Sequence, residues 1–278
     1  MIFVYKKWEM FCDALGKKNR YSVTAKEVLN AKVTNPYLVL KHDVETDVQK
    51  AYKIALIEKQ HGHRGTYYAQ AYLLNDIKNV KLLKEMQAMG HEISYHYDVM
   101  DSNKGDIDAA HLEFEHHKST FEKNGFIVET VCQHGNPVVE RKGYTSNRDF
   151  FRNEKIRKLY SNISDIMVDF PEKAKTEYSY FSDAGRKFKK IYDPFMNDVI
   201  NSDDKNIVYD EIEDLLDAIM PNENCMISIH PHRWTDSAFT YVLKSAIFKG
   251  IKMLAKKMMK VPIFKRIMSR YYYLAKKI

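Results

Sequence analysis

Residues 37–43 read Tyr37-Leu38-Val39-Leu40-Lys41-His42-Asp43, an apolar run that Asn35-Pro36 sets off from the preceding chain. This pattern predicts a buried strand, with chemically active groups where the strand ends. Helical spacing follows from residue 47 to residue 60, and Gly62 ends it. A strand followed by a helix is the repeating unit of a parallel α/β fold.

The same alternation continues along the chain. Predicted strands are residues 37–43, 65–70, 92–97, 128–133, 165–170, 178–181, 191–192 and 225–230. Predicted helices are residues 47–60, 76–89, 106–123, 209–220 and 243–261. Strands that alternate with helices of this length predict βα units in a parallel sheet or barrel.

Composition and charge separate a main domain from a tail. The 278 residues are 45% hydrophobic and 13% aromatic, which predicts a globular core and excludes disorder for most of the chain. The net charge is +7, but residues 237–278 hold eleven Lys/Arg and no acid, which leaves −4 for residues 1–236. We therefore predict a domain of residues 1–236 and a basic tail of residues 237–278. With the basic charge confined to the tail, nucleic acid is not an expected partner.

The cysteines and the apolar segments indicate the compartment. Cys12, Cys132 and Cys225 are far apart and form no CxxC pair, which argues against a disulfide framework and for a reducing compartment. The first seven residues lack the features of a signal peptide, and no stretch has the roughly 18 apolar residues of a membrane-spanning helix. The expected location is the cytoplasm, and the tail leaves peripheral attachment to the inner face of the cell membrane open.

Groups that bind metals or transfer protons gather at four predicted strand ends. They are His42, Asp43 and Glu45; His96 and Asp98; His134; and His230 and His232. Because the carboxyl ends of parallel strands share one edge, we expect a site there. Each residue also has a structural interpretation, such as helix capping by Asp43, but recurrence at four strand ends favours a site. His91, at the opposite end of its strand, and His116-His117, on a helix, are expected to lie outside the site.

Three segments in order, Lys41-His42-Asp43-Val44-Glu45, Gly65-Thr66-Tyr67-Tyr68 and Gly90-His91-Glu92-Ile93-Ser94-Tyr95-His96-Tyr97, carry a family resemblance. Together they resemble the polysaccharide deacetylase (NodB-homology) family, in particular its divergent WbmS-like branch, which is linked to capsule and lipopolysaccharide genes. Ser228-Ile229-His230-Pro231 is similar to the closing motif of that family, and residues 180–186 are similar to a further motif of the branch. The resemblance covers roughly residues 36–236.

The resemblance implies a distorted (β/α) barrel with one divalent metal ion, usually zinc, that hydrolyses an N- or O-acetyl group on a sugar. It implies that Asp43 is the general base and His230 the acid that protonates the leaving group. It places Glu45 and His96 among the metal ligands. Candidate substrate-binding residues are Tyr68, Asn136, Asp183, Arg186 and Trp234.

Two residues depart from the family pattern. The second metal histidine of the family corresponds here to Met100, whose thioether is a poor ligand for a hydrolytic metal site. Glu45 is one methylene longer than the usual aspartate. His134 ends the fourth strand where most of the family has an arginine–proline motif, and we expect it to supply the missing ligand. The alternative is a site that no longer binds metal or no longer catalyses.

The tail is predicted to be an amphipathic helix. Leu243, Ile247, Ile251, Leu254, Met258 and Val261 fall on one side at helical spacing, whereas lysines occupy the other. A helix that packs on the domain is one interpretation. An acid-free basic face fits an anionic membrane surface better, with residues 243–278 as the contact.

The function expected from the sequence is therefore enzymatic. We expect a metal-dependent hydrolase of amide carbon–nitrogen bonds that deacetylates a sugar in cell-surface polysaccharide biosynthesis. The alternatives are a non-catalytic glycan-binding or scaffolding protein on the same fold, and a membrane-surface assembly factor that acts through the tail.

Overall fold

The computed structural model describes residues 3–33, 35–136, 139–192, 194, 206–219 and 222–258, without the side chains of residues 248, 249, 251, 252 and 254–258. The described strands form one sheet in the order β5-β4-β3-β2-β1-β9-β6-β7-β8. They are β1 (Leu38–Val44), β2 (Gly65–Ala69), β3 (Glu92–Tyr97), β4 (Thr130–Gln133), β5 (Ser164–Asp165), β6 (Ser179–Ser182), β7 (Phe188–Lys190), β8 (Ile207–Tyr209) and β9 (Cys225–Ile229).

The sheet is mostly parallel. All neighbouring strands from β5 to β6 in this order are parallel. Among the described strands, the antiparallel pairs are β6 with β7 and β7 with β8. The prediction of an α/β fold is confirmed. No pairing between described strands joins β5 to β8, so closure into the predicted barrel is not shown.

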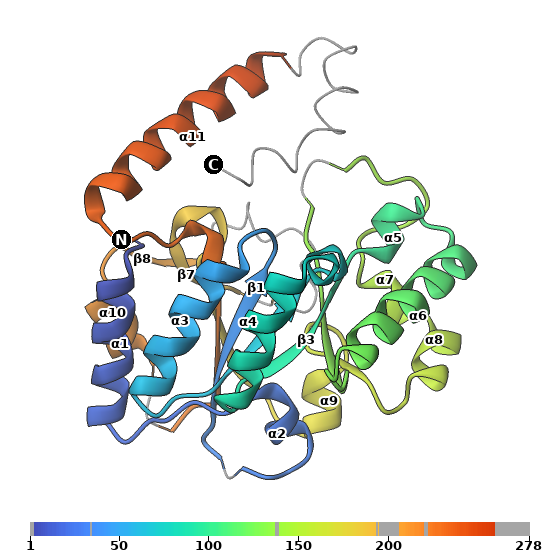
Figure 1. Cartoon of the computed structure of the whole chain (residues 1–278), viewed down its shortest axis with the longest axis horizontal. Helices are drawn as coiled ribbons and strands as arrows, with labels where there is room; N and C mark the ends of the chain where they lie inside the picture. The colour runs from blue at the N-terminus through green and yellow to red at the C-terminus, as the bar shows by residue number, and fades with distance from the viewer. Residues whose placement is uncertain are drawn as a thin grey trace.

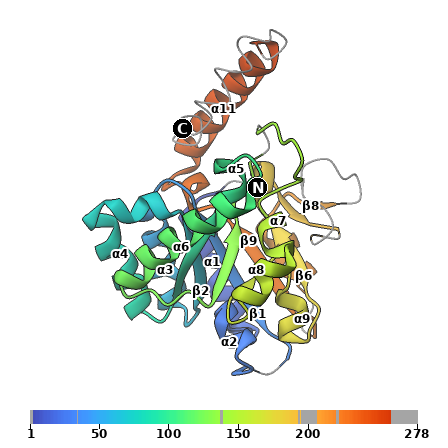
Figure 2. The ribbon, with the colours of Figure 1, turned by 90° about the vertical axis from the view of Figure 1, so that its right-hand side faces the viewer.

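Helices cover both sides of this sheet, and α11 extends away from it. They are α1 (Tyr5–Lys17), α2 (Ala25–Leu29), α3 (Val48–Gln60), α4 (Ile77–Ala88), α5 (Val99–Ser102), α6 (Ile107–Lys123), α7 (Asp149–Arg152), α8 (Glu154–Leu159), α9 (Phe170–Ala174), α10 (Ile212–Ala218) and α11 (Ala238–Met258). Figure 1 shows α1, α3 and α4 side by side in front of the sheet, and Figure 2 shows α7 to α9 on its other side.

The predicted helix boundaries follow from capping. Asp47, Asp76 and Asp106 each accept a hydrogen bond from a backbone N–H in the first turn of α3, α4 and α6. The chain leaves α3 and α4 through Gly62 and Gly90, whose φ angles of 77° and 99° suit glycine. These caps explain why the predicted ends of the three helices lie within a residue or two of the ends in the structure.

Several predicted elements differ in the structure. The strand predicted at residues 165–170 is wrong: Asp165 accepts a hydrogen bond from the Met167 backbone N–H at 2.7 Å, which turns the chain, and α9 begins at Phe170. In place of the strand predicted at residues 191–192, the structure has β7, which ends one residue earlier at Lys190. Helix α10 begins three residues later than predicted, and helix α11 begins five residues earlier than predicted. Residues 259–261 of the predicted tail helix and everything after them lie outside the described residues.

A buried polar network joins α1 and α3 to strands β1 and β2. The Glu58 carboxylate, fully buried in the last turn of α3, accepts hydrogen bonds from Trp8 Nε1 at 3.2 Å and from the Tyr67 hydroxyl at 2.7 Å. His42 Nε2 lies 2.8 Å from Glu58 Oε1. Burial raises the pKa of Glu58, but His42 and the hydrogen-bond donors hold it below its ordinary value. The charge therefore fixes the packing of α1 and α3 on β1 and β2.

We expect Glu58→Ala to lower the free energy of unfolding by about 3–5 kcal/mol, because it leaves buried donors and an imidazole without their partner. Chemical denaturation measures the loss. Glu122→Ala, which removes the ion pair between the exposed Glu122 and the half-buried Lys118 on α6, is the matched control and should cost less than about 1 kcal/mol. Equal losses in the two variants would contradict the role given to Glu58.

Candidate metal centre

The carboxyl edge of the sheet brings the predicted site residues together. Asp43 and Glu45 lie at the end of β1, His96 in β3, His134 directly after β4 and His230 directly after β9. The parallel register aligns these strands, with His42 opposite both Tyr67 and Ile229, and His96 opposite Cys132. The convergence expected from the sequence is therefore present in the structure.

Glu45, His96 and His134 form a compact group of metal-capable side chains. One potential ligand atom from each of these buried residues lies within 4.8 Å of the others. Glu45 Oε1 is 3.3 Å from His134 Nε2, and the rings of His96 and His134 are 5.2 Å apart and nearly perpendicular. Ligands of a tetrahedral zinc ion lie about 3.4 Å from one another, so the group needs little movement to hold such an ion.

The hydrogen bonding of His96 also fits a metal ligand. Its Nδ1 lies 3.0 Å from the Cys132 carbonyl oxygen, an acceptor that fixes the proton on this nitrogen. Its Nε2 is buried and has no hydrogen-bond partner. Burial lowers the pKa of His96 to about 3, against the opposing effect of Asp43, so the imidazole is neutral at physiological pH. A buried, neutral nitrogen without a partner is the form that binds a metal ion.

A second group, Asp43, His96 and Cys132, is equally close in space but chemically less suitable. The ammonium of Lys41, buried in β1, lies 2.8 Å from Asp43 Oδ2. Burial raises the pKa of Asp43, but Lys41 and then His96 and His230 lower it to about 2. Burial raises the pKa of the Cys132 thiol well above its ordinary value. A resident cation and a protonated thiol both oppose a metal ion here, which favours the Glu45 group.

His230 is held beside Asp43 and Glu45 by a buried carboxylate. Its Nδ1 lies 2.5 Å from Asp183 Oδ1, and its Nε2 lies 3.7 Å from Asp43 Oδ2 and 4.0 Å from Glu45 Oε1. Arg233 Nη1 donates to Asp183 Oδ1 at 2.9 Å. Burial raises the pKa of Asp183, but Arg233 and His230 hold it below its ordinary value. The arrangement orients the imidazole with Nε2 toward the other site residues.

Met100 has a structural role. It is buried in α5 within the apolar core, among residues such as Val99 and Phe114. His134 arrives at the metal-capable group from the neighbouring strand, as expected for a replacement ligand.

Three of the predicted substrate-binding residues have buried side chains. The Tyr68 side chain is fully buried, with its hydroxyl 2.8 Å from Thr130 Oγ1. Trp234 is fully buried and stacks on Phe3, with ring centroids 5.2 Å apart. Asp183 is fully buried against His230 and therefore supports that histidine. The contacts given above account for these side chains by packing, and substrate binding by the three residues stays a prediction.

The two other candidates for substrate binding lie closer to solvent. Asn136 is half-buried two residues after His134, and its backbone oxygen accepts a hydrogen bond from Arg141 at 3.0 Å. Arg186 is half-buried and follows Asp183, whose backbone oxygen accepts a hydrogen bond from the Arg186 N–H at 3.0 Å. Substrate binding by these two residues remains a prediction.

The histidines expected outside the site do lie outside it. His91 is buried beneath the amino end of β3, where Nδ1 accepts a hydrogen bond from the Gly65 N–H at 2.9 Å. His116 and His117 lie on α6, and His117 Nδ1 is 2.6 Å from the Tyr95 hydroxyl. Both line a hollow on the outer surface that also includes Asp98.

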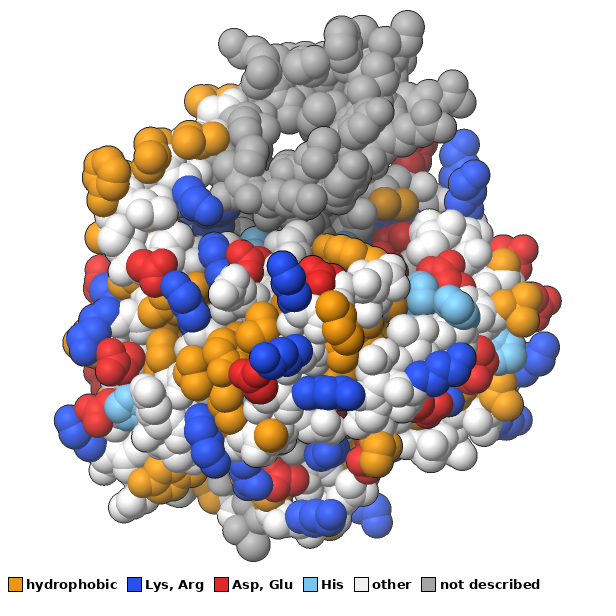
Figure 3. Space-filling view, in the orientation of Figure 1, with side chains coloured by type: hydrophobic (Ala, Val, Ile, Leu, Met, Phe, Trp, Pro, Cys, Tyr) orange, Lys and Arg blue, Asp and Glu red, His pale blue; other side chains and the backbone are white. Residues whose placement is uncertain are grey.

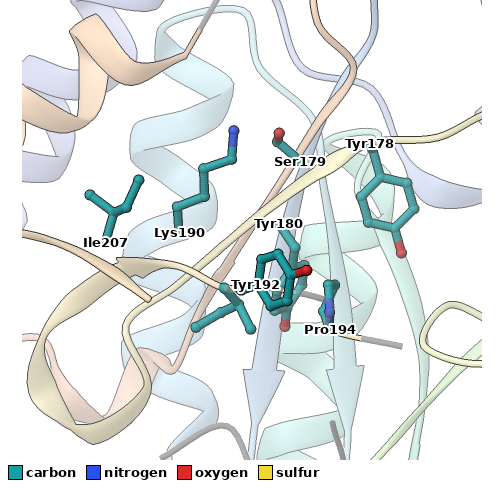
Figure 4. A pocket seen from close by; sticks show the side chains of 8 residues that line it. Tyr178, Ser179, Tyr180, Lys190, Tyr192, Pro194 and Ile207 are labelled. Atoms are coloured by element: carbon teal, nitrogen blue, oxygen red, sulfur yellow. The ribbon is translucent and has the colours of Figure 1, made fainter. Parts of the chain in front are cut away.

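A cavity of about 280 Å³ lies beside β6 and β7. Its walls include Tyr178, Tyr180, Tyr192 and Lys190 (Figure 4). Tyr180 also reaches the site, because its hydroxyl lies 3.5 Å from Lys41 Nζ. The cavity therefore adjoins the Lys41–Asp43 pair through this side chain.

Sequence reasoning missed Lys41 and Arg233 as parts of the site. Lys41 stands in the quoted motif two residues before Asp43, which puts the two side chains on the same face of a strand. Arg233 follows His230 by three residues, and a basic residue so close to the last histidine was the available signal. Both act through carboxylates whose positions only the tertiary structure reveals.

We expect the protein to bind one divalent ion, and Glu45→Gln, His96→Ala and His134→Ala each to weaken binding at least about 100-fold. Titration calorimetry with Zn²⁺ measures the affinity. Cys132→Ser and Asp43→Asn are the matched controls and should keep the ion, because they alter only the competing group. Loss of the ion in these controls, with retention in His134→Ala, would assign the metal to the other group.

Comparison with known proteins adds no relative. No protein-family model matches the chain, and no curated protein matches it. Within the described residues, no helix is both long and apolar enough to cross a membrane.

Proposed function

We propose that the chain is a metal-dependent, deacetylase-like hydrolase that removes an acetyl group from the nitrogen or oxygen of a sugar in cell-surface polysaccharide biosynthesis. One observation carries the proposal. The three side chains Glu45, His96 and His134 lie beside a carboxylate that is paired with a lysine, Asp43, and beside a histidine that is oriented by a carboxylate, His230. The family resemblance of the strand-end motifs supports the same reaction.

Glu45, His96 and His134 would hold the metal ion, and their nitrogen and oxygen donors suit zinc. When bound, such an ion acidifies a water molecule and polarises an acetyl carbonyl. The remaining chemistry belongs to side chains of the chain itself.

Asp43 is the proposed general base. Lys41 holds Oδ2 at 2.8 Å, whereas Oδ1 is buried and has no hydrogen-bond partner. The low pKa of Asp43 keeps its carboxylate ionised at neutral pH, which is the form that a general base requires, and the same low pKa makes it a weak base. The Lys41 contact also restricts rotation of the carboxylate.

His230 is the proposed general acid. The ionised Asp183 carboxylate accepts a hydrogen bond from His230 Nδ1–H and stabilises the imidazole, as a buried carboxylate does beside other catalytic histidines. A second proton on Nε2 then faces the site and can pass to the departing amine or hydroxyl group of the sugar. Arg233 keeps Asp183 ionised in this arrangement.

A non-catalytic glycan-binding protein on the same fold is the second candidate. It is favoured by the Lys41–Asp43 ion pair, since a carboxylate with a pKa of about 2 is a weak base. The two functions differ in whether an acetylated glycan is bound only or also converted.

We expect Asp43→Asn and His230→Ala each to reduce acetate release from N-acetylated oligosaccharides by about 10²–10⁴-fold, because each removes one proton-transfer group. Acetate release by the zinc-loaded protein measures the rate, and calorimetry verifies that each variant keeps its metal. His116→Ala, outside the site, is the matched control and should keep wild-type activity.

The two candidate functions predict opposite results for wild-type protein. If the zinc-loaded wild type binds acetylated oligosaccharides and releases no acetate from N- or O-acetylated forms, the enzyme proposal is wrong. The glycan-binding function would then account for the site.

A further inference from the structure

The start of α11 is fixed to the main domain. Thr235 pairs with the N-terminal segment, because its backbone oxygen accepts a hydrogen bond from the Tyr5 N–H at 3.0 Å. The Ser237 hydroxyl then accepts a hydrogen bond from the Thr240 N–H at 3.2 Å. Tyr241 is buried, and its ring centroid lies 5.7 Å from that of Phe3. The first turn of the helix therefore has a defined orientation on the domain.

From this anchor α11 extends away from the sheet and its covering helices (Figures 1 and 2). Its apolar side chains are turned outward, with the following exposed fractions: Phe239 77%, Val242 56%, Leu243 50%, Ile247 45% and Met253 65%. At about 100° per residue they lie within about 140° of one another, opposite the buried Tyr241. Figure 3 shows the same arrangement as a row of hydrophobic side chains along the outer side of the helix.

Among the described side chains of α11, the exposed apolar ones therefore do not pack on the domain, although the interpretation as an ordinary amphipathic helix places them there. A contiguous apolar face left in water is unfavourable and marks an interaction surface. The charge of the surrounding sequence identifies the partner. Residues 237–278 contain eleven Lys/Arg and no Asp/Glu. A partner that matches both the charge and the exposed apolar side chains has anionic groups at its surface and an apolar layer beneath them.

We propose that α11 docks on the surface of an anionic lipid bilayer and lies in the plane of the interface, with Phe239, Leu243 and Ile247 inserted between the headgroups. An exposed apolar stripe together with an acid-free basic sequence is the pattern of interfacial helices. The helix leaves the sheet eight residues after His230, from the same carboxyl edge that holds the metal-capable group. Docking would therefore bring that edge to the bilayer.

Vesicle flotation of the full-length protein tests this inference. Wild-type protein should bind vesicles of phosphatidylglycerol and phosphatidylcholine at least about tenfold more tightly than vesicles of phosphatidylcholine alone, and added salt should weaken the binding. The triple variant Phe239→Gln, Leu243→Gln, Ile247→Gln should bind the anionic vesicles at least about tenfold more weakly, since glutamine keeps the helix but removes the apolar contact.

The matched control removes three apolar side chains of the main domain that are at least as exposed as the three on α11. The triple variant Ile77→Gln, Leu112→Gln, Ile127→Gln should bind vesicles like the wild type. The proposal is overturned if both triple variants bind equally, or if the wild type prefers neutral vesicles. It is also overturned if light scattering finds a wild-type dimer that the α11 variant abolishes while vesicles capture neither protein, because the occupant would then be a second copy of the chain.

Discussion

The buried ion pair between Lys41 and Asp43 is the interaction on which the site depends. Both residues lie on β1, between β2 and β9, and both are almost completely buried. An unpaired ammonium in this position would cost several kcal/mol, so Lys41 requires both the Asp43 carboxylate and further hydrogen-bond acceptors around it. The Ser228 hydroxyl at 3.2 Å and the Tyr180 hydroxyl at 3.5 Å complete the shell of Lys41.

The pair gives the two carboxylates at the end of β1 different chemical environments. Asp43 is neutralised by an internal cation, whereas Glu45 faces the imidazoles of His134, His230 and His232. Enzymes that use two acids in one site commonly separate their roles through such differences in environment. In the function that we propose, Glu45 binds the metal ion and one oxygen of Asp43 serves in proton transfer.

The sequence predicted those parts of the structure that depend on local pattern. Strands β1, β2 and β3 and the helices between them were predicted because apolar runs, aspartate caps and terminal glycines all agree along a short stretch. The meeting of the site residues at the carboxyl edge of the sheet was predicted because the strands were expected to be parallel. Lys41 was missed because a lysine in a strand indicates exposure unless its partners are known, and Tyr180 and Ser228 are distant in sequence.

Long-range packing also determines features that the sequence did not reveal. Trp234 was expected to face a ligand, but Phe3 and Trp8 from the N-terminal segment cover it. Helix α1 itself was not predicted, although Trp8, Phe11, Cys12 and Leu15 follow a helical spacing that later proves to be its buried face. The tail was predicted as amphipathic, but only the structure shows that its described apolar residues face outward.

The most direct test of the account is the anomalous X-ray scattering of zinc in crystals of the metal-loaded protein. We expect one zinc peak within about 2.0–2.2 Å of nitrogen atoms of His96 and His134 and of an oxygen of Glu45, with Lys41 still paired to Asp43. A zinc ion bound between Asp43 and Cys132, with Lys41 displaced, would contradict the assignment of roles. Crystals soaked with zinc that show no peak at this edge of the sheet would contradict the metal centre itself.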